Sequence, residues 1–272
     1  MDTFPEWYAD IHDPGQHPRV IAQLRDRGLV TFSGIHDRAG LLAVARRLIT
    51  IRPHRDAGTD GVTVITATGD TVASGYSAFT DAELTPHTDG SSLADPPRFV
   101  MLACLQPAAE GGETCVVDGA RVLATLAARA PAALRALSAP QSASFGADYG
   151  YLGSICEALE PGRLRIRLRL DELARFSPEV TRLLPLLRTA IEANTEMFRL
   201  RSGEGFLLTN SRWLHGRRRY AGGQRMMLRI LGDPLPGTGI EPGFPHHPSG
   251  HMAQTKTRSQ TRIVAASPTP AL

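Results

Sequence analysis

Residues 203–233, GEGFLLTNSRWLHGRRRYAGGQRMMLRILGD, decide the fold that the sequence predicts. The stretch consists of short apolar runs separated by glycine-rich turns, SGEG before the first run and AGGQ before the last. Short apolar runs bounded by glycine are typical of β-strands. Three strands are expected here, in FLLTN (206–210), SRWLHGRRRY (211–220) and RMMLRILGD (225–233).

The preceding part of the chain adds further strands and a few helices. Strands are expected at residues 29–35, 62–69, 84–89, 98–105, 114–118 and 164–168. Helices are expected at residues 18–27, 41–49, 119–137 and 178–194. Short strands between glycine-rich turns, with the helices gathered early and in one insertion, are typical of a β-sandwich or barrel with flanking helices. We expect a single domain over residues 1–260 and a disordered tail over residues 261–272.

The composition argues against several classes of protein. Hydrophobic residues make up 42% of the 272 residues and charged residues 21%, which excludes disorder along the whole chain. The net charge, 30 − 27 = +3, is too small to require a nucleic-acid partner. Lys256 is the only lysine and lies in a polar C-terminal stretch. The chain therefore lacks the lysine of a phosphate-binding Walker loop and a suitable Schiff-base lysine.

The cysteines and the hydropathy favour a cytoplasmic protein. Cys104, Cys115 and Cys156 form no CxxC pair, which argues against a disulfide framework and a cysteine zinc site. The N-terminal stretch MDTFPEWYAD lacks the basic start and apolar run of a secretion signal. The longest apolar run, residues 99–105, is far shorter than the roughly 18 residues that suggest a membrane span. We expect no membrane segment.

His87 and Asp89 stand two residues apart in LTPHTDGSS, at the end of an expected strand. Side chains at positions i and i+2 of a strand point to the same face, so an imidazole nitrogen and a carboxylate oxygen could hold one metal ion. His215 follows another strand, 215 − 89 = 126 residues after Asp89. Two histidines and a carboxylate form the facial triad that leaves one face of an octahedral Fe(II) open. The simpler alternatives are that His87 and Asp89 are a solvated pair and that His215 is a hydrogen-bonded histidine of the core. His54, in a loop-like context, is interpreted as structural or solvated.

Two arginines follow His215 on the last expected strand. In RMMLRI the strand period places Arg225, Met227 and Arg229 on one face. An arginine that points into a barrel is costly unless an anion meets it, and its planar guanidinium matches a carboxylate. A bound dicarboxylate would supply that anion, and an Asp or Glu of the core is the alternative partner.

Together these stretches resemble the Fe(II)- and 2-oxoglutarate-dependent dioxygenases of the taurine dioxygenase and clavaminate synthase type. The resemblance extends from about Leu29 to about Leu235, and it rests on PHTDGS, on PPRFVMLACLQPAAEGGETCVVDG and on GEGFLLTNSRWLHGRRRY followed by RMMLRI. It implies a double-stranded β-helix, the jelly-roll class, and an enzyme that uses Fe(II), 2-oxoglutarate and O2. It assigns iron to His87, Asp89 and His215, and 2-oxoglutarate to Thr114 and Arg229.

The register of the two arginines bears on the substrate. We prefer Arg229 as the 2-oxoglutarate anchor, because its distance from His215 matches the clavaminate synthase group better. Relatives that act on acids commonly carry a further arginine four residues beyond the anchor, where this chain has Asp233. This departure favours a substrate amine or hydroxyl. If Arg225 holds 2-oxoglutarate instead, Arg229 is free for an acidic substrate.

We therefore expect oxidation of an unactivated C–H bond in a polar, amine-bearing small molecule, with release of succinate and CO2. An amino acid or an intermediate of antibiotic biosynthesis would fit. Asp89 stands where halogenating relatives have Gly or Ala, which favours oxygenation. The candidate substrate contacts are Tyr76, Phe79, Asp81, Glu83, Asp148 and Asp233. The alternatives are the same chemistry on a nucleobase or a protein side chain, and a non-catalytic jelly-roll binding module.

Overall fold

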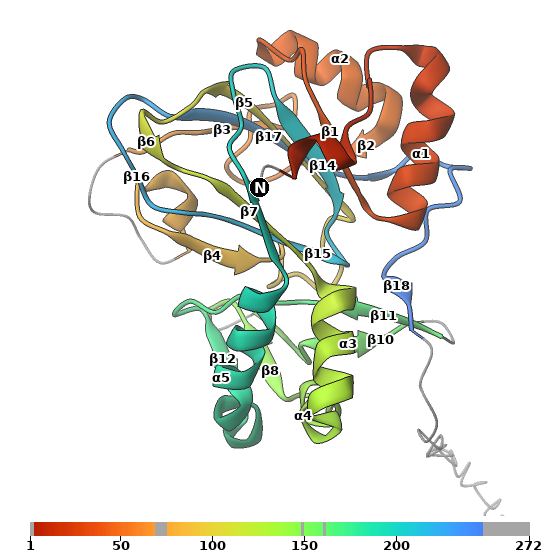
Figure 1. Ribbon diagram of the computed structural model, residues 1–272, viewed down its shortest axis with the longest axis vertical. Helices are drawn as coiled ribbons and strands as arrows, with labels where there is room; N and C mark the ends of the chain where they lie inside the picture. Colours follow the sequence, from red (N-terminus) through yellow and green to blue (C-terminus); the bar gives the residue numbers. More distant parts are fainter. Residues whose placement is uncertain (1–2, 69–74, 148–149, 160–161, 247–272) are drawn as a thin grey trace, which may run out of the picture.

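Figure 1 shows the computed structural model, which describes residues 3–68, 75–147, 150–159 and 162–246. The fold is mainly β with accompanying helices, as the sequence predicts. The tail expected at residues 261–272 and the single lysine, Lys256, lie outside the described residues. Within the described ranges, no helix combines the length and the apolar character that crossing a membrane requires.

Two antiparallel sheets form the centre of the molecule. The larger sheet has the order β1-β14-β5-β17-β2, with β3 paired to β17. Its strands are β1 (Leu29–Phe32), β14 (Gly205–Thr209), β5 (Phe99–Gln106), β17 (Met226–Pro234), β2 (Ile49–Ile51) and β3 (Val62–Ile65). The smaller sheet has the order β13-β7-β15-β4. Its strands are β13 (Thr195–Phe198), β7 (Thr114–Asp118), β15 (Trp213–Arg217) and β4 (Leu84–His87).

A shared apolar cluster packs the two sheets against each other. It contains Val100 and Phe206 from the larger sheet together with Val116 and Trp213 from the smaller one. Strand β17 contributes Met227 to this cluster, whereas its neighbours Leu228 and Ile230 belong to the cluster on the other face of the larger sheet. The alternation expected along RMMLRI is therefore confirmed, and every second side chain of β17 points between the sheets.

Two helices cover the outer face of the larger sheet, α1 (His17–Asp26) and α2 (Arg38–Leu48). Asp37 caps α2, because its carboxylate accepts a hydrogen bond from the Gly40 N–H at 2.7 Å. Apolar residues of both helices, such as Val20 and Leu41, pack with Phe32 of β1. This layer leaves the opposite face of the sheet for the functional site.

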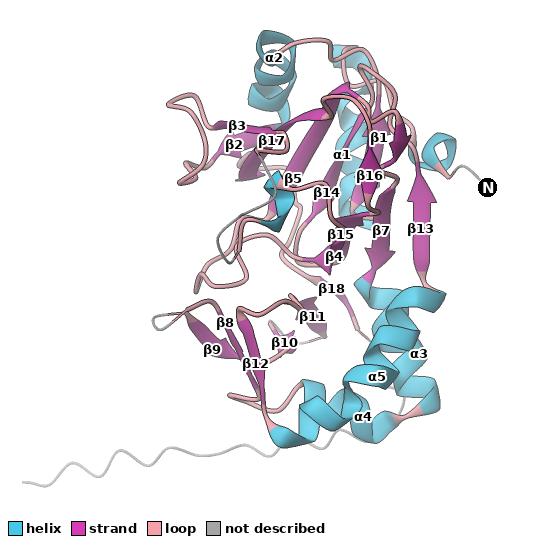
Figure 2. Ribbon diagram, turned by 90° about the vertical axis from the view of Figure 1, so that its left-hand side faces the viewer, coloured by secondary structure: helices cyan, strands magenta, loops and turns pink. Residues whose placement is uncertain are grey.

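An insertion joins β7 to β13 and forms the lower half of the molecule in Figure 1 and Figure 2. It has its own apolar cluster, built from three helices and short strands. The helices are α3 (Gly119–Arg129), α4 (Pro131–Leu137) and α5 (Pro178–Ala193). The helical structure expected over residues 119–137 is confirmed except at Ala130, which has φ −152° and ψ 73° and separates α3 from α4. Proline disfavours the helical conformation of the residue before it, and Pro131 has this effect on Ala130.

The remaining elements are short. The strands are β6 (Glu110–Gly111), β8 (Ala143–Phe145), β9 (Tyr151–Gly153), β10 (Cys156–Ala158), β11 (Arg163–Ile166), β12 (Ala174–Phe176), β16 (Tyr220–Ala221) and β18 (Phe244–Pro245). Three 3-10 turns complete the set: η1 (Phe4–Trp7), η2 (Pro14–Gln16) and η3 (Ser77–Phe79). Of these, η3 lies next to the functional site, because its residue Ala78 borders the pocket there.

Candidate active site

His87, Asp89 and His215 meet at one end of the smaller sheet. The register pairs His87 of β4 directly with His215 of β15, and Asp89 follows two residues after His87. Asp89 Oδ1 lies 3.6 Å from His87 Nε2, and Asp89 Oδ2 lies 3.9 Å from His215 Nε2. One potential ligand atom from each residue lies within 4.8 Å of the others. The structure thus brings together three side chains that the sequence separates by up to 128 positions (215 − 87).

Backbone groups orient these side chains. His87 Nδ1 lies 3.0 Å from the Thr85 carbonyl oxygen, so a proton on Nδ1 leaves the lone pair of Nε2 free. Asn210, at the end of β14, binds the main chain of Asp89 on both sides. Its Oδ1 accepts the Asp89 N–H at 2.8 Å, and its Nδ2 donates to the Asp89 carbonyl at 2.8 Å. These hydrogen bonds therefore hold the His87 ring and the Asp89 main chain in place within the site.

The protonation states of the triad suit a divalent metal ion. Burial raises the pKa of Asp89, but Arg229 and the two histidines outweigh it, so the net pKa lies well below the usual value. Burial and the neighbouring His87 lower the pKa of His215 to about 3. An ionised carboxylate and a neutral imidazole are the forms that ligate metal. The donor set of two histidines and one carboxylate fits Fe(II) with open coordination positions.

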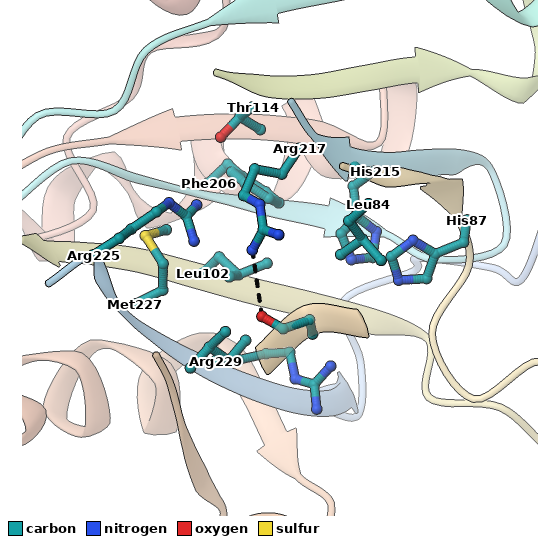
Figure 3. Close-up of a pocket in the computed structure, with 13 residues that line it drawn as sticks. Leu84, His87, Leu102, Thr114, Phe206, His215, Arg217, Arg225, Met227 and Arg229 are labelled. Atoms are coloured by element: carbon teal, nitrogen blue, oxygen red, sulfur yellow. Dashed lines mark hydrogen bonds between the residues drawn. The ribbon is translucent and has the colours of Figure 1, made fainter. Parts of the chain in front are cut away.

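A pocket extends from the histidine pair between the two sheets (Figure 3). Leu84, Leu102, Phe206 and Met227 give it apolar walls. Thr114 of β7 borders it, together with three arginines. These are Arg217 of β15, Arg225 of the turn before β17, and Arg229 of β17. The pocket is therefore apolar in its walls and strongly cationic in its polar groups.

The two arginines predicted to share a face have different partners. Nη1 of Arg229 lies 3.3 Å and 3.2 Å from the two carboxylate oxygens of Asp89. Arg225 is equally buried, but no carboxylate among the described residues forms an ion pair with it. Its guanidinium lies 5.6 Å from the ring centroid of Tyr220, and burial lowers its pKa. Of these two arginines, Arg225 is thus the one whose charge lacks a carboxylate partner within the described residues.

The candidate substrate contacts mostly lie outside the pocket lining. Tyr76 and Phe79 pack against each other at 6.0 Å between ring centroids, and the Arg55 guanidinium lies 4.6 Å from the Tyr76 centroid. Asp81 accepts the Tyr220 N–H through its backbone carbonyl at 3.0 Å. The Glu83 side chain is about half exposed and pairs with Arg218 at 2.9 Å. Of the described residues 75–83, only Ala78 lines the pocket.

Asp233, also expected near the substrate, has a different environment. It forms an ion pair with Arg52 at 3.3 Å and accepts the Arg98 N–H at 3.2 Å, and it does not line the pocket. It lies on the part of β17 that pairs with β2, beyond the residues of β17 that border the site. Its carboxylate is therefore committed to holding chain segments together. Asp148 lies outside the described residues.

His54, Asn210 and Arg217 are site residues that the sequence analysis did not select. His54 lies close enough to Arg229 and Asp89 for their charges to act on its pKa, which burial, followed by Arg229, lowers. His54 belongs to the connection between β2 and β3, and both of these strands pair with β17. No spacing in the sequence relates His54 to Asp89 or Arg229, so only the sheet pairing could reveal that they lie near each other. For Asn210, a polar residue directly after the apolar run FLLT was an available signal.

The chain is similar to a known family of dioxygenases and to a curated protein. Residues 3–231 match the family model described as taurine catabolism dioxygenase TauD, TfdA family. Gamma-butyrobetaine dioxygenase of Homo sapiens is 28% identical over 173 residues, which cover 57% of this chain and 44% of that protein. The chain thus matches less than half the length of this curated relative.

Several solved structures share the fold at lower sequence identity. An asparagine oxygenase in complex with Fe(II), 2S,3S-3-hydroxyasparagine and succinate has a TM-score of 0.64 and 18% identity, over 84% of each chain. PvcB, an Fe, alpha-ketoglutarate dependent oxygenase, has a TM-score of 0.62 and 18% identity, over 84% of this chain and 82% of that one. A taurine dioxygenase from Burkholderia xenovorans has a TM-score of 0.60 and 16% identity, over 84% and 86%.

Proposed function

Because this chain belongs to the TauD/TfdA family of non-haem iron, 2-oxoglutarate-dependent oxygenases, we propose that His87, Asp89 and His215 hold its iron. Its substrate, in this proposal, is an amino-acid-like small molecule. The convergence of the three side chains at one end of a cationic pocket carries the proposal. With Fe(II) bound, 2-oxoglutarate and O2 supply the oxidising power for a C–H bond, and succinate and CO2 are released.

The protein's own residues prepare the site for this chemistry. Asn210 and Thr85 keep the carboxylate and the imidazole of the triad in place before metal binds. The apolar walls of the pocket exclude water from the region next to the metal, which strengthens electrostatic interactions there. The two sheets that enclose the pocket are, in this proposal, the double-stranded β-helix that the resemblance implies.

We assign the distal carboxylate of 2-oxoglutarate to Arg225 and Thr114, which reverses the preference for Arg229 stated from the sequence. Arg229 already neutralises Asp89, so its charge is engaged at the metal end. Arg225 is buried beside Thr114 in the same pocket and lacks a carboxylate partner among the described residues. A planar guanidinium can bind a carboxylate with two parallel hydrogen bonds. The anion that Arg225 lacks is therefore the one that 2-oxoglutarate would bring.

This assignment changes the expected substrate. With Arg225 as the anchor, Arg229 is the arginine four residues further on, and it lies at the metal end with His54 nearby. Asp89 contacts only Nη1 of Arg229, so the remaining N–H groups of Arg229 and the His54 imidazole can donate hydrogen bonds to a carboxylate on a substrate. The names of the similar proteins, gamma-butyrobetaine dioxygenase and asparagine oxygenase, refer to small molecules that carry both a carboxylate and a nitrogen group. We therefore propose an amino acid or a similar amino acid derivative, within a cytoplasmic biosynthetic pathway.

Anaerobic spectroscopy tests this function without knowledge of the substrate. Addition of Fe(II) and 2-oxoglutarate to the purified protein should produce the visible charge-transfer band of the Fe(II)–2-oxoglutarate complex. His215→Ala should abolish the band. Arg225→Gln should raise the 2-oxoglutarate concentration for half-saturation about 100-fold, which corresponds to loss of a buried charge pair.

Arg229→Gln is the matched control for the anchor. It removes the same charge from another arginine of the pocket lining, and it should change the half-saturating 2-oxoglutarate concentration far less than Arg225→Gln. The opposite order of the two variants would return the anchor to Arg229. Absence of the band in the unaltered protein would reject the proposed function itself.

A further inference from the structure

Arg217 lines the pocket together with Arg225 and also contacts a neighbouring chain segment, residues 78–82. It lies on β15, two residues after His215, and is only 4% exposed. Its side chain reaches residues 78–82, which include the end of η3. Nη1 donates to the Ala78 carbonyl at 3.3 Å, and Nη2 donates to the carbonyls of Thr80, at 2.8 Å, and Ala82. Figure 3 shows Arg217 among the residues that line the pocket, with a hydrogen bond of its guanidinium drawn as a dashed line.

One donor of this guanidinium is left unused. The Nε–H of Arg217 is buried, and no described residue supplies a hydrogen-bond acceptor for it. A buried polar group without a partner is rare in proteins, because its desolvation is not compensated. Arg217 lines the same pocket as Thr114 and Arg225, where we place the distal carboxylate of 2-oxoglutarate. An anion in that place would supply the missing acceptor.

The charges around Tyr220 also favour an anion there. The guanidinium carbons of Arg217 and Arg225 lie 4.8 Å and 5.6 Å from the centroid of the Tyr220 ring. Within the described part of the chain, neither guanidinium hydrogen-bonds to a carboxylate. Two like charges repel each other strongly in a buried environment. A carboxylate bound beside them would convert this repulsion into attraction.

We infer that Arg217 is a positioning residue that couples the binding of 2-oxoglutarate to the closure of residues 78–82 over the pocket, with its Nε–H donating to the bound anion while Nη1 and Nη2 hold the backbone carbonyls. The inference rests on the proposed function. Ala78 lines the pocket and Phe79 packs against the cluster between the sheets, so this segment forms part of the wall that the ligand would touch. The ligand would thereby stabilise its own enclosure.

Hydrogen–deuterium exchange of the full chain tests the coupling. With anaerobic Fe(II) present, 2-oxoglutarate should slow exchange in peptides covering residues 76–84 by about tenfold, the effect of strengthening hydrogen bonds to a charged group. In Arg217→Gln, exchange there should be faster without ligand, and 2-oxoglutarate should no longer slow it. Arg217→Lys keeps the charge but lacks the fork of donors, so it should recover only part of the response.

Arg219→Gln is the matched control, because Arg219 is exposed and lies two residues further along the chain. This variant should show the same ligand-dependent slowing as the unaltered protein. A merely structural role of Arg217 would give faster exchange in Arg217→Gln with the response to 2-oxoglutarate retained, and that result would overturn the coupling. If Arg217→Gln does not fold, the measurements on the unaltered protein and on Arg217→Lys decide the matter by the same criterion.

Calorimetric titration with 2-oxoglutarate separates this inference from the function on which it rests. If 2-oxoglutarate binds the unaltered protein but leaves exchange at residues 76–84 unchanged, the coupling is wrong and the proposed function stands. If 2-oxoglutarate does not bind at all, both are overturned. Binding together with slowed exchange that depends on Arg217 supports both.

Discussion

The metal end of the pocket carries balanced buried charges, whereas the opposite end carries unbalanced ones. At the metal end, Asp89 and Arg229 face each other at 3.2 Å and both are more than nine-tenths buried. At the opposite end, Arg217 and Arg225 are buried without a carboxylate partner in the described part of the chain. In the first arrangement each buried charge has a counter-ion, which offsets part of the cost of its desolvation. The second becomes favourable only when an anion arrives, so charge balance distinguishes a preformed metal site from a ligand site.

Asp89→Ala should have the largest effect, because it breaks the balanced end. It removes a proposed iron ligand and leaves Arg229 buried without its partner. Loss of one member of a buried pair costs roughly 3–5 kcal/mol, so the metal-free protein should be destabilised by about this amount. Urea denaturation of the metal-free protein measures it. Asp89→Ala combined with Arg229→Gln should recover part of the loss; no recovery would show that Arg229 is not the affected partner.

Arg225→Gln and Arg229→Gln should separate the two ends by their opposite effects on stability. Without ligand, Arg229→Gln should lower the free energy of unfolding by about 3 kcal/mol, because it leaves the Asp89 carboxylate buried without its cation. Arg225→Gln should leave it unchanged or raise it, because it removes a buried charge that lacks a counter-ion. Denaturation of both metal-free variants checks the difference. Equal losses in the two variants would contradict the contrast between the ends.

Asn210→Ala should weaken the metal end without altering any proposed ligand. Supporting residues around metal sites typically contribute 10–100-fold to metal affinity, so we expect the Kd for Fe(II) to rise by roughly 10-fold or more. Anaerobic competition with a chelator measures the Kd. Asn210→Asp keeps the acceptor for the Asp89 N–H but buries a carboxylate against the carbonyls of Asp89 and Pro97, so its Kd should rise at least as far as that of Asn210→Ala. An unchanged Fe(II) affinity in Asn210→Ala would show that the Asp89 backbone needs no such support.

Asp233→Asn should have the smallest effect, because Asp233 belongs to neither end. Its partly exposed ion pair with Arg52 predicts a loss of about 1 kcal/mol or less in the free energy of unfolding. The affinities for Fe(II) and 2-oxoglutarate should remain those of the unaltered protein. Titrations of both ligands check this. A clear loss of 2-oxoglutarate affinity would place Asp233 nearer to the pocket than its contacts indicate.

Much of this arrangement was predictable from the sequence, because its signals are local. The strand period placed Arg225, Met227 and Arg229 on one face, and the structure confirms it. The i and i+2 spacing placed His87 and Asp89 together for the same reason. Glycine-rich turns marked the strands of the last third of the chain.

The remainder depends on pairing between distant strands, which a single sequence does not reveal. The choice between Arg225 and Arg229 needed the position of Asp89, which only the folded protein brings beside β17. His54 reaches the site because β2 and β3 both pair with β17. Asp233 carries a charge suited to a substrate, but its ion pair with Arg52 becomes visible only when β2 and β17 meet.

The insertion leaves and rejoins the sheets at adjacent points, since Val117 of β7 pairs with Thr195 of β13. A module with neighbouring ends can be exchanged between related chains without displacing the strands on either side. It nevertheless contacts the metal-binding segment: the Leu168 carbonyl accepts the Thr88 N–H at 2.8 Å, and Arg167 donates to the Ser91 carbonyl at 2.8 Å. Chimaeras that keep these two contacts should therefore preserve the iron ligands, whereas chimaeras that lose them should bind metal less tightly.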